Sequence, residues 1–148
     1  MQRVTRAGVR VDGELKGEIA AGLLVLVGAT HGDDSDAAQW LARKVSELRI
    51  FGDAEGRMNL DVREASGSVL VIPQFTLYGD ARRGRRPDFT SAARPEIAAP
   101  LIESFGHAIE SLGLRVERGV FGAHMVVELV NDGPVTLMIE SPRAVETA

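Results

Sequence analysis

An uninterrupted apolar run at residues 23–27, Leu-Leu-Val-Leu-Val, constrains the fold more than any other stretch of the chain. Gly22 and Gly28 bound this run. It is therefore too short to stand alone as a helix, and its β-branched and aliphatic content favours a strand. A strand without a polar position has no face suited to water. The run predicts a central strand that is covered on both faces.

Signals for hairpins and short strands occur along most of the chain. Residues 3–11 alternate loosely, Asp12 and Gly13 supply a two-residue turn, and residues 14–19 follow; together they predict an opening β-hairpin. Further short strands are expected at residues 58–60, 68–72 with a continuation through Pro73 into 74–78, 114–117 and 125–130. A proline inside a strand removes a hydrogen-bond donor, so Pro73 indicates an edge, a bulge or a break.

Only two segments carry a helical period. The first places Ala37, Leu41, Val45 and Leu48 on one face, and the second runs from about residue 95 to residue 112. The acidic residues at 33–36 directly precede the first helix, where capping and the helix dipole favour them over a metal site. Two helices are too few for a doubly wound parallel sheet. The order predicts an α+β domain with a mainly antiparallel sheet or barrel and two principal helices.

Length and composition indicate one domain. The 148 residues, 45% of them hydrophobic, match a single core over residues 1–148, with residues 142–148 as a frayed tail. No window approaches the ~18 consecutive apolar residues that a membrane helix needs, and the start lacks a signal-peptide core. We therefore expect a cytoplasmic protein without membrane contact. Cysteine is absent, which excludes disulfides, thiolate nucleophiles and cysteine metal sites.

A basic run interrupts an otherwise acidic chain. The net charge of −4 argues against a wholly basic nucleic-acid binder, but Arg82, Arg83, Arg85 and Arg86 fall within five positions. A local cluster of this kind can meet phosphates even on an acidic protein. A solvated loop without a ligand is the alternative that stays open.

The usual catalytic templates are missing from the sequence. There is no Gly-x-Ser-x-Gly, His-Glu-x-x-His or Gly-x-x-x-x-Gly-Lys motif, and His31, His107 and His124 are far apart. Only folding could assemble a triad from these histidines. Main-chain amides at a strand break can stabilise an oxyanion, and residues 74–76 after Pro73 are candidates for such donors. Thr76 as a covalent nucleophile would need a base, and none is nearby in sequence.

Residues 131–136, Asn-Asp-Gly-Pro-Val-Thr, place a Gly-Pro peptide between two apolar, strand-like runs. The simplest interpretation is a hairpin turn. An X-Pro bond can be cis at a cost of about 0.5–1 kcal/mol, which would turn the carbonyls of Gly133 and Pro134 in a fixed, unusual direction. A functional role for this peptide is therefore the second interpretation.

In their order and spacing, these segments resemble the D-aminoacyl-tRNA deacylase family. Residues 73–78 followed by 82–87 are similar to its Ser-Gln-x-x-Leu motif, and residues 131–136 to its Asn-x-Gly-Pro-x-Thr motif; residues 2–7, 23–28, 48–51, 58–60 and 119–123 also look like this family. The resemblance implies the α+β fold of the family. It also implies a cytoplasmic homodimer without cofactor or metal, which hydrolyses the ester between a D-amino acid, or glycine, and the 3′-terminal adenosine of aminoacyl-tRNA.

The resemblance further implies a role for individual residues. The Gly133–Pro134 bond would be cis and would enter the active site of the other subunit, where its carbonyls reject an L side chain. The active sites would thus lie at the subunit interface, and the 2′-hydroxyl of the terminal ribose would help water to attack. The other implied residues are Gln74, Phe75 and Thr76 in the catalytic pocket, with the Phe75 amide as oxyanion donor; Arg3, Pro73, Met125, Asn131 and Thr136 for substrate binding and support; and Arg82, Arg83, Arg85 and Arg86 for tRNA.

A departure within the first motif and two alternative functions accompany this resemblance. Pro73 stands where the family motif has serine, so one hydroxyl and one main-chain donor are lost, which bears on rate more than on identity. A non-catalytic tRNA- or RNA-binding module that uses residues 82–86 would explain the arginine run equally well. A structural dimer built on the buried strands is the second alternative. Hydrolysis, rather than binding, separates the enzyme from both.

Overall fold

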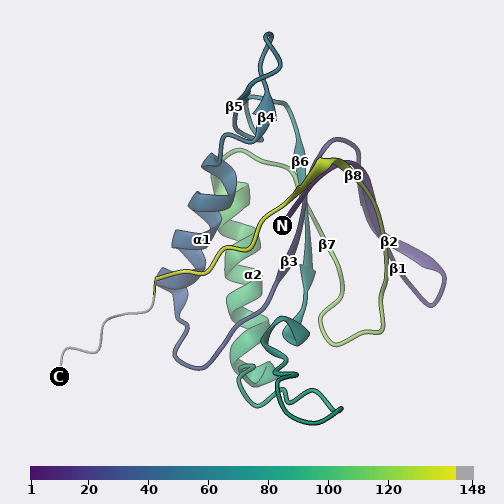
Figure 1. Cartoon of the computed structure of the whole chain (residues 1–148), viewed down its shortest axis with the longest axis vertical. Helices are drawn as coiled ribbons and strands as arrows, with labels where there is room; N and C mark the ends of the chain where they lie inside the picture. Colours follow the sequence, from purple (N-terminus) through teal and green to yellow (C-terminus); the bar gives the residue numbers. More distant parts are fainter. Residues whose placement is uncertain (143–148) are drawn as a thin grey trace.

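The computed structural model describes residues 1–142, so most of the expected frayed tail lies outside the described residues. The chain forms a mixed sheet and two helices, which agrees with the predicted α+β domain (Figure 1). The elements of the main sheet are β1 (Gln2–Val11), β2 (Glu14–Ile19), β3 (Gly22–Val27), β6 (Ser68–Pro73), β7 (Val116–Arg118) and β8 (Val126–Thr136). The remaining elements are α1 (Ser35–Glu47), β4 (Phe51–Gly52), β5 (Met58–Leu60), the 3-10 helix η1 (Phe75–Tyr78) and α2 (Pro95–Ser111).

Strand β1 divides its pairing among three neighbours and thereby curves the sheet. The sheet order is β2-β1-β3-β6-β7, and β8 pairs with β1. Near its start β1 pairs with β3, farther along it pairs with β2, and β8 follows it over most of its length, all in the antiparallel sense. The β3–β6 and β6–β7 pairs are parallel. The sheet is therefore mixed and barrel-like, with its antiparallel part at the β1 side.

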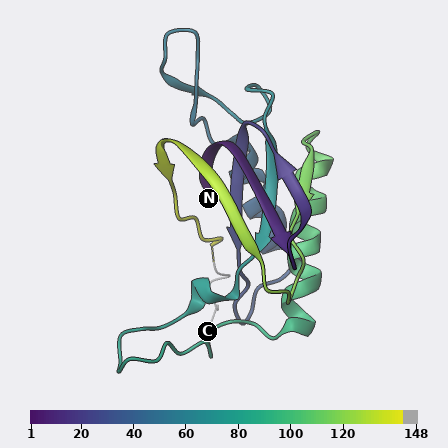
Figure 2. The ribbon, with the colours of Figure 1, turned by 90° about the vertical axis from the view of Figure 1, so that its right-hand side faces the viewer.

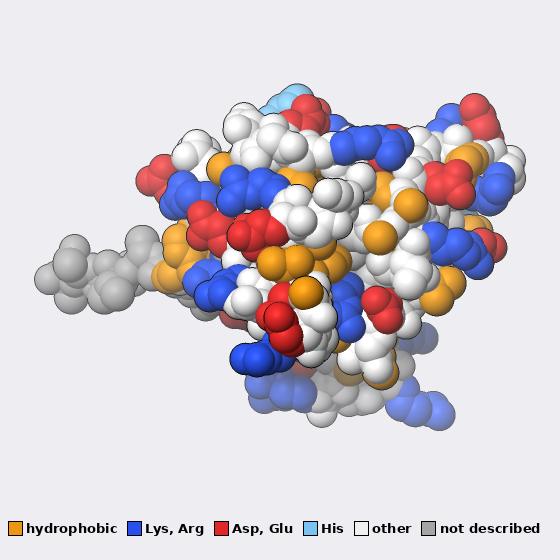
Figure 3. Space-filling model, turned by 90° about the horizontal axis from the view of Figure 1, so that it is seen from above, with side chains coloured by type: hydrophobic (Ala, Val, Ile, Leu, Met, Phe, Trp, Pro, Cys, Tyr) orange, Lys and Arg blue, Asp and Glu red, His pale blue; other side chains and the backbone are white. Residues whose placement is uncertain are grey.

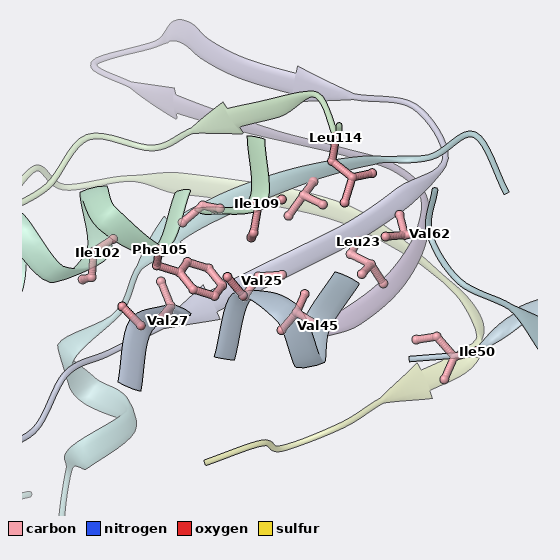
Figure 4. Packing of buried hydrophobic residues seen from close by; sticks show 14 of the residues in the cluster. Leu23, Val25, Val27, Val45, Ile50, Val62, Ile102, Phe105, Ile109 and Leu114 are labelled. Carbon is pink, nitrogen blue, oxygen red and sulfur yellow. The ribbon is translucent and has the colours of Figure 1, made fainter. Parts of the chain in front are cut away.

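The predicted central strand is confirmed in β3, which lies between β1 and β6. Its alternate side chains enter two different cores. Leu23, Val25 and Val27 pack toward α1 and α2, whereas Leu24 packs with residues of β1, β2 and β6 on the other face. Figure 4 shows Phe105 of α2 lying against the β3 side chains. Burying a side chain of this size contributes about 1.5–3 kcal/mol, so the sheet is fixed from both faces.

The opening hairpin and the first helix also follow their predicted local signals. Asp12 and Gly13 both have positive φ, 50° and 78°, which suits the two-residue turn between β1 and β2. Asp34 caps α1, because its side chain accepts a hydrogen bond from the Ala37 amide at 2.9 Å. The capping interpretation of the acidic segment is thus confirmed. Between residues 1 and 142, neither helix has the length and apolar content needed to cross a membrane.

Two predicted strand features are wrong, and a third is displaced. Residues 74–78 do not continue β6 as a strand but form η1, because Pro73 ends the ladder. The Gly-Pro peptide is not a turn between two strands, since β8 runs through it from Val126 to Thr136, and residues 137–139 lie outside any strand. The strand expected at 114–117 is shifted to Val116–Arg118, where its partner β6 is available.

Candidate active site

Pro73 ends strand β6 and sets the position of the first motif. Pairing with β3 stops at Val27 and Pro73, and the amide of Gln74 then donates to the Val27 carbonyl at 2.8 Å. The chain turns directly into η1. The predicted break at Pro73 is confirmed, and it brings Gln74, Phe75 and Thr76 out of the core at the end of a buried strand.

The main-chain amides of Phe75 and Thr76 are unpaired donors. They open η1, where the first N–H groups have no partner within the helix. Neither amide makes a hydrogen bond to any residue between 1 and 142. The Thr76 hydroxyl accepts a hydrogen bond from the Gln74 side-chain amide, and the Phe75 side chain is 57% exposed. Two adjacent unpaired amides at an accessible turn are suited to hold an oxyanion.

The second motif forms a bulge in β8, which we call the β8 bulge (residues 132–135). Val4 of β1 is paired with Asn131 and Gln2 is paired with Thr136, so these four residues stand opposite the single residue between Gln2 and Val4. The Asn131 side chain closes the bulge: it accepts from the Val135 amide at 2.8 Å and donates to the Val135 carbonyl at 3.2 Å and the Thr136 hydroxyl at 3.0 Å. Hydrogen bonds of the Asn131 side chain therefore connect the two ends of the bulge.

The Gly133–Pro134 peptide at the centre of the β8 bulge is cis, as the resemblance implied. Gly133 has a φ of 138°, which L side chains rarely adopt. A Cβ atom added there would lie 2.8 Å from the Val135 side chain and 3.1 Å from the Arg3 guanidinium. Only glycine fits this position without a shift of its neighbours.

Arg3 connects the β8 bulge to the rest of the fold. It is the residue of β1 that faces the bulge, and its side chain is only 15% exposed. Its Nε donates to the Asp132 carbonyl at 2.9 Å, and its Nη1 donates to the Ile50 carbonyl at 2.5 Å. Arg3 thus contacts the segment that the resemblance assigned to it, and it also reaches the start of the β4–β5 hairpin.

Pro73 and Met125 meet around Gly119. The Gly119 amide donates to the Val71 carbonyl at 2.9 Å, which holds this glycine against β6. A Cβ atom on Gly119 would lie 2.7 Å from the Met125 sulfur and 3.5 Å from the Pro73 ring. The structure therefore brings together two of the predicted substrate-binding residues, from the end of β6 and from the residue before β8.

The four arginines lie in one exposed loop, which we call the arginine loop (residues 80–88). Asp80 and Asp88 close it with two main-chain hydrogen bonds of 2.7 and 2.9 Å. The Arg82 guanidinium donates to both carboxylate oxygens of Asp80, at 2.9 and 2.7 Å, and these bonds lower the pKa of Asp80 to about 2. Arg83, Arg85 and Arg86 form no ion pair within residues 1–142. Three of the four charges are thus free for an external anion.

The arginine loop extends from the body of the molecule at the end opposite the β4–β5 hairpin (Figures 1 and 2). The face at the hairpin end carries interspersed basic and acidic side chains, so it presents no field of a single sign (Figure 3). A polyanion would therefore be attracted to the loop end of the molecule more strongly than to the hairpin end.

The two motifs border one apolar cavity of about 220 Å³. Leu77 and Tyr78 of η1 line one side, and Thr136 lines another, together with β3 and the segment that follows β8. The predicted catalytic residues Gln74–Thr76 and the predicted filter Gly133–Pro134 are not among its lining residues. Within one chain, therefore, this cavity includes Thr136 of the predicted site residues but neither the predicted catalytic residues nor the predicted filter.

The histidines are dispersed, and the described residues contain no group of three or more His, Cys, Asp or Glu placed to hold a metal ion. The His31 Nε2 atom lies 2.7 Å from the Thr90 carbonyl oxygen, and the His107 ring contacts Glu103 on the same helix at 3.0 Å. These contacts secure a loop and a helix surface. Folding does not bring these two rings to one another.

Sequence reasoning missed two participants in the site. The Ile50 carbonyl is the second acceptor for Arg3, and a main-chain acceptor leaves no mark in the residue types. Phe89 packs against Phe75, with ring centroids 5.2 Å apart at an interplanar angle of 70°. An apolar residue three positions after the arginine run was its only sequence signal.

A family model and curated relatives place this chain in one family. The family model described as D-Tyr-tRNA(Tyr) deacylase matches residues 1–140. A D-aminoacyl-tRNA deacylase of Thermomicrobium roseum is 55% identical over 141 residues, which covers 95% of this chain and 92% of the relative. A D-aminoacyl-tRNA deacylase of Symbiobacterium thermophilum is 56% identical, with coverage of 97% and 95%.

Two solved structures share the fold. One is described as the c-Myc DNA Unwinding Element Binding Protein; it is 37% identical, with a TM-score of 0.88 over 95% of this chain and 96% of the other. The second is described as a probable eukaryotic D-amino acid tRNA deacylase and is 17% identical, with a TM-score of 0.77 and coverage of 90% and 92%. At that identity the second likeness supports the fold alone.

Proposed function

Because this chain belongs to the D-Tyr-tRNA(Tyr) deacylase family, we propose that it hydrolyses the ester between a D-amino acid and the 3′-terminal adenosine of tRNA. The observation that carries the proposal is the pair of unpaired amides of Phe75 and Thr76 at the start of η1. Ester hydrolysis passes through a tetrahedral intermediate with a negative oxygen, and main-chain donors stabilise that charge without a side-chain nucleophile.

In the proposed reaction, water attacks the ester carbonyl and the 2′-hydroxyl of the terminal ribose assists it. The oxygen of the intermediate accepts hydrogen bonds from the Phe75 amide, with the Thr76 amide beside it. Gln74 and Thr76 are hydrogen-bonded to each other through their side chains, so they shape this turn. The ester bond then breaks to give the free amino acid and a tRNA with a free 3′-hydroxyl. A terminal 2′-deoxyadenosine should slow hydrolysis more than it weakens binding.

Chirality is selected by rejection in this proposal. The β8 bulge presents main-chain carbonyls of Gly133 and Pro134, and Asn131 and Arg3 hold the bulge in place. A fixed carbonyl excludes a side chain on the L face of the substrate but not a hydrogen atom. Glycine esters should therefore be hydrolysed, and L-alanine esters should not.

The filter works between two copies of the chain, which form a homodimer with the active sites at their interface. The cavity of one chain lacks the filter residues, and large apolar side chains stand exposed on and after β8. These are Val126, Leu129, Val130, Leu137 and Met138, the last of them 90% exposed. A second copy that covers this surface removes it from water. Met138→Asp should shift the protein toward monomers in light scattering, whereas Leu15→Asp on β2 should not.

The arginine loop holds the aminoacylated end of the tRNA in this proposal. We also place the protein in the cytoplasm. Arg83, Arg85 and Arg86 have no ion pair within the described chain, so their charges can replace counterions along the phosphate backbone. Arg82 contributes less, because Asp80 already neutralises it.

The proposal is tested with matched D- and L-aminoacyl-tRNA. The chain should release the D-amino acid and leave the L-ester intact over the same interval. Equal hydrolysis of both esters would overturn the filter, and hydrolysis of neither would overturn the enzyme. Salt-dependent tRNA binding without hydrolysis would identify the RNA-binding module, and the absence of both binding and hydrolysis would identify a structural dimer.

A further inference from the structure

The arginine loop and the proposed oxyanion turn are joined by an aromatic contact. Phe89 directly follows Asp88, which closes the arginine loop, and its ring packs edge-to-face on Phe75 at 5.2 Å between centroids. An edge-to-face pair at this distance is attractive beyond its burial of apolar area. Both rings are partly exposed, at 57% for Phe75 and 38% for Phe89. The contact therefore lies at the surface and not in the core.

Gly79 makes this contact close. It follows η1 and donates its amide to the Thr76 carbonyl at 2.9 Å. A Cβ atom on Gly79 would lie 2.9 Å from the Phe89 ring and 3.0 Å from the Thr76 carbonyl. Gly79 has a φ of −66°, which suits any residue, so the close approach of the Phe89 ring and the Thr76 carbonyl explains the glycine here.

These contacts make one unit of the two segments. Phe89 touches Phe75 at the start of η1 and lies against Gly79 at its end, so its ring spans the whole turn. The same residue stands at the root of the arginine loop, one position after the Asp80–Asp88 bridge. A shift of the loop therefore moves a ring that is packed on the residue whose amide is the proposed oxyanion donor.

We propose that Phe89 is a positioning residue, which holds the Phe75 and Thr76 amides in place and links phosphate binding by the arginine loop to ester hydrolysis. The inference rests on the proposed function, since it concerns the donors of that reaction. Phe89 touches neither the ester nor the tRNA phosphates in this account. Its effect reaches the reaction only through η1.

If Phe89 is a positioning residue, its loss should lower kcat and leave the affinity for tRNA nearly unchanged. A small displacement of catalytic donors costs rate steeply, whereas phosphate contacts at the loop tip are unaffected. Phe89→Leu should lower kcat on D-aminoacyl-tRNA by on the order of tenfold and leave the Kd for deacylated tRNA within about twofold. Phe89→Tyr keeps the edge-to-face ring, so it should retain the wild-type kcat. A loss of tRNA affinity equal to the loss of kcat would overturn the positioning role.

The glycine gives an independent variant with a matched control. Gly79→Ala pushes the Phe89 ring away at a φ that alanine adopts, and its methyl group also crowds the Thr76 carbonyl of η1. It should lower kcat as Phe89→Leu does. Gly52→Ala is the control, because no atom lies within 4 Å of a Cβ at Gly52, and it should leave kcat unchanged. Equal kcat for Gly79→Ala and Gly52→Ala would contradict the proposal.

A measurement without substrate separates this inference from the proposed function. Hydrogen exchange of the Gly79 amide, which is bonded to Thr76, should accelerate in Phe89→Leu and stay slow in Phe89→Tyr. Unchanged exchange would show that Phe89 does not hold η1, even if the wild-type chain is an active deacylase. Accelerated exchange in a chain that hydrolyses no ester would overturn the proposed function and retain the contact.

Discussion

The two motifs of this chain are held in opposite ways. The β8 bulge is closed by three hydrogen bonds of the Asn131 side chain and by Arg3, which is half-buried beside it. The turn at η1 stands at the surface with two unpaired amides. A group that rejects a substrate by steric exclusion must be rigid, so that the rejected side chain cannot displace it. A group that stabilises a developing charge must keep its hydrogen-bond donors unoccupied. The difference in bonding thus follows the difference in proposed task.

The strongest way to break this comparison is to add one methyl group to the bulge. Gly133→Ala should lower the free energy of unfolding by about 3 kcal/mol, because a strained φ and overpacking each cost roughly 1–3 kcal/mol. The control is Gly56→Ala, which has a positive φ of 79° but no atom within 4 Å of the added Cβ. It should cost about 1 kcal/mol. Equal losses in urea unfolding would show that the bulge yields easily.

Removing the side chain that closes the bulge should have the next largest effect. Asn131→Ala leaves the partly buried Val135 amide and carbonyl without their partner, which should cost about 2 kcal/mol of unfolding free energy. Gln39→Ala, at an exposed position of α1, should stay within about 0.5 kcal/mol of the wild type. A loss for Asn131→Ala as small as that control would mean that the bulge is held from elsewhere.

Variants of the exposed arginine loop test the other side of the comparison, the segment that is open to the substrate. Arg83→Ala should weaken tRNA binding severalfold and reduce the slope of log K against log salt by about 1, because one phosphate contact is lost. Arg82→Ala should do less, since its charge is already paired with Asp80 at 2.7 Å. Binding titrations at several salt concentrations measure both. Identical slopes for the two variants would contradict the assignment of the free charges.

The smallest expected effect is at the end of β6. Pro73→Ser restores a hydroxyl and a main-chain donor next to the oxyanion turn, so turnover of D-aminoacyl-tRNA should rise or stay level. The ratio of D to L hydrolysis should not change, because the β8 bulge is untouched. Single-turnover assays on both esters provide the comparison. A large fall in turnover would make the proline itself part of the site.

Local signals predicted the parts of the fold that local contacts determine. The apolar run of β3, the turn at Asp12 and the cap at Asp34 each depend on residues a few positions apart, and each was confirmed. The path of β8 through the Gly-Pro peptide depends on pairing with β1, which is more than a hundred residues away. The local sequence pattern favoured a turn there, because it carries no information about pairing with a distant strand.

The candidate site divides in the same way. The motif residues were visible because their types and spacing recur within a family, and the Arg3 contact with the bulge followed from that resemblance. The Ile50 carbonyl and the Phe75–Phe89 contact had no comparable signal. One is a main-chain atom, and the other depends on how the arginine loop folds back on η1.

The ratio of D to L hydrolysis in variants of the two motifs tests the division of tasks most directly. Thr76→Ala alters the open turn and should lower the rate with the ratio unchanged, whereas Gly133→Ala alters the bulge and should lower the ratio. Arg3→Lys gives the second readout with the glycine retained, because it removes one of the two guanidinium hydrogen bonds. A ratio that falls in Thr76→Ala and persists in both bulge variants would contradict the account.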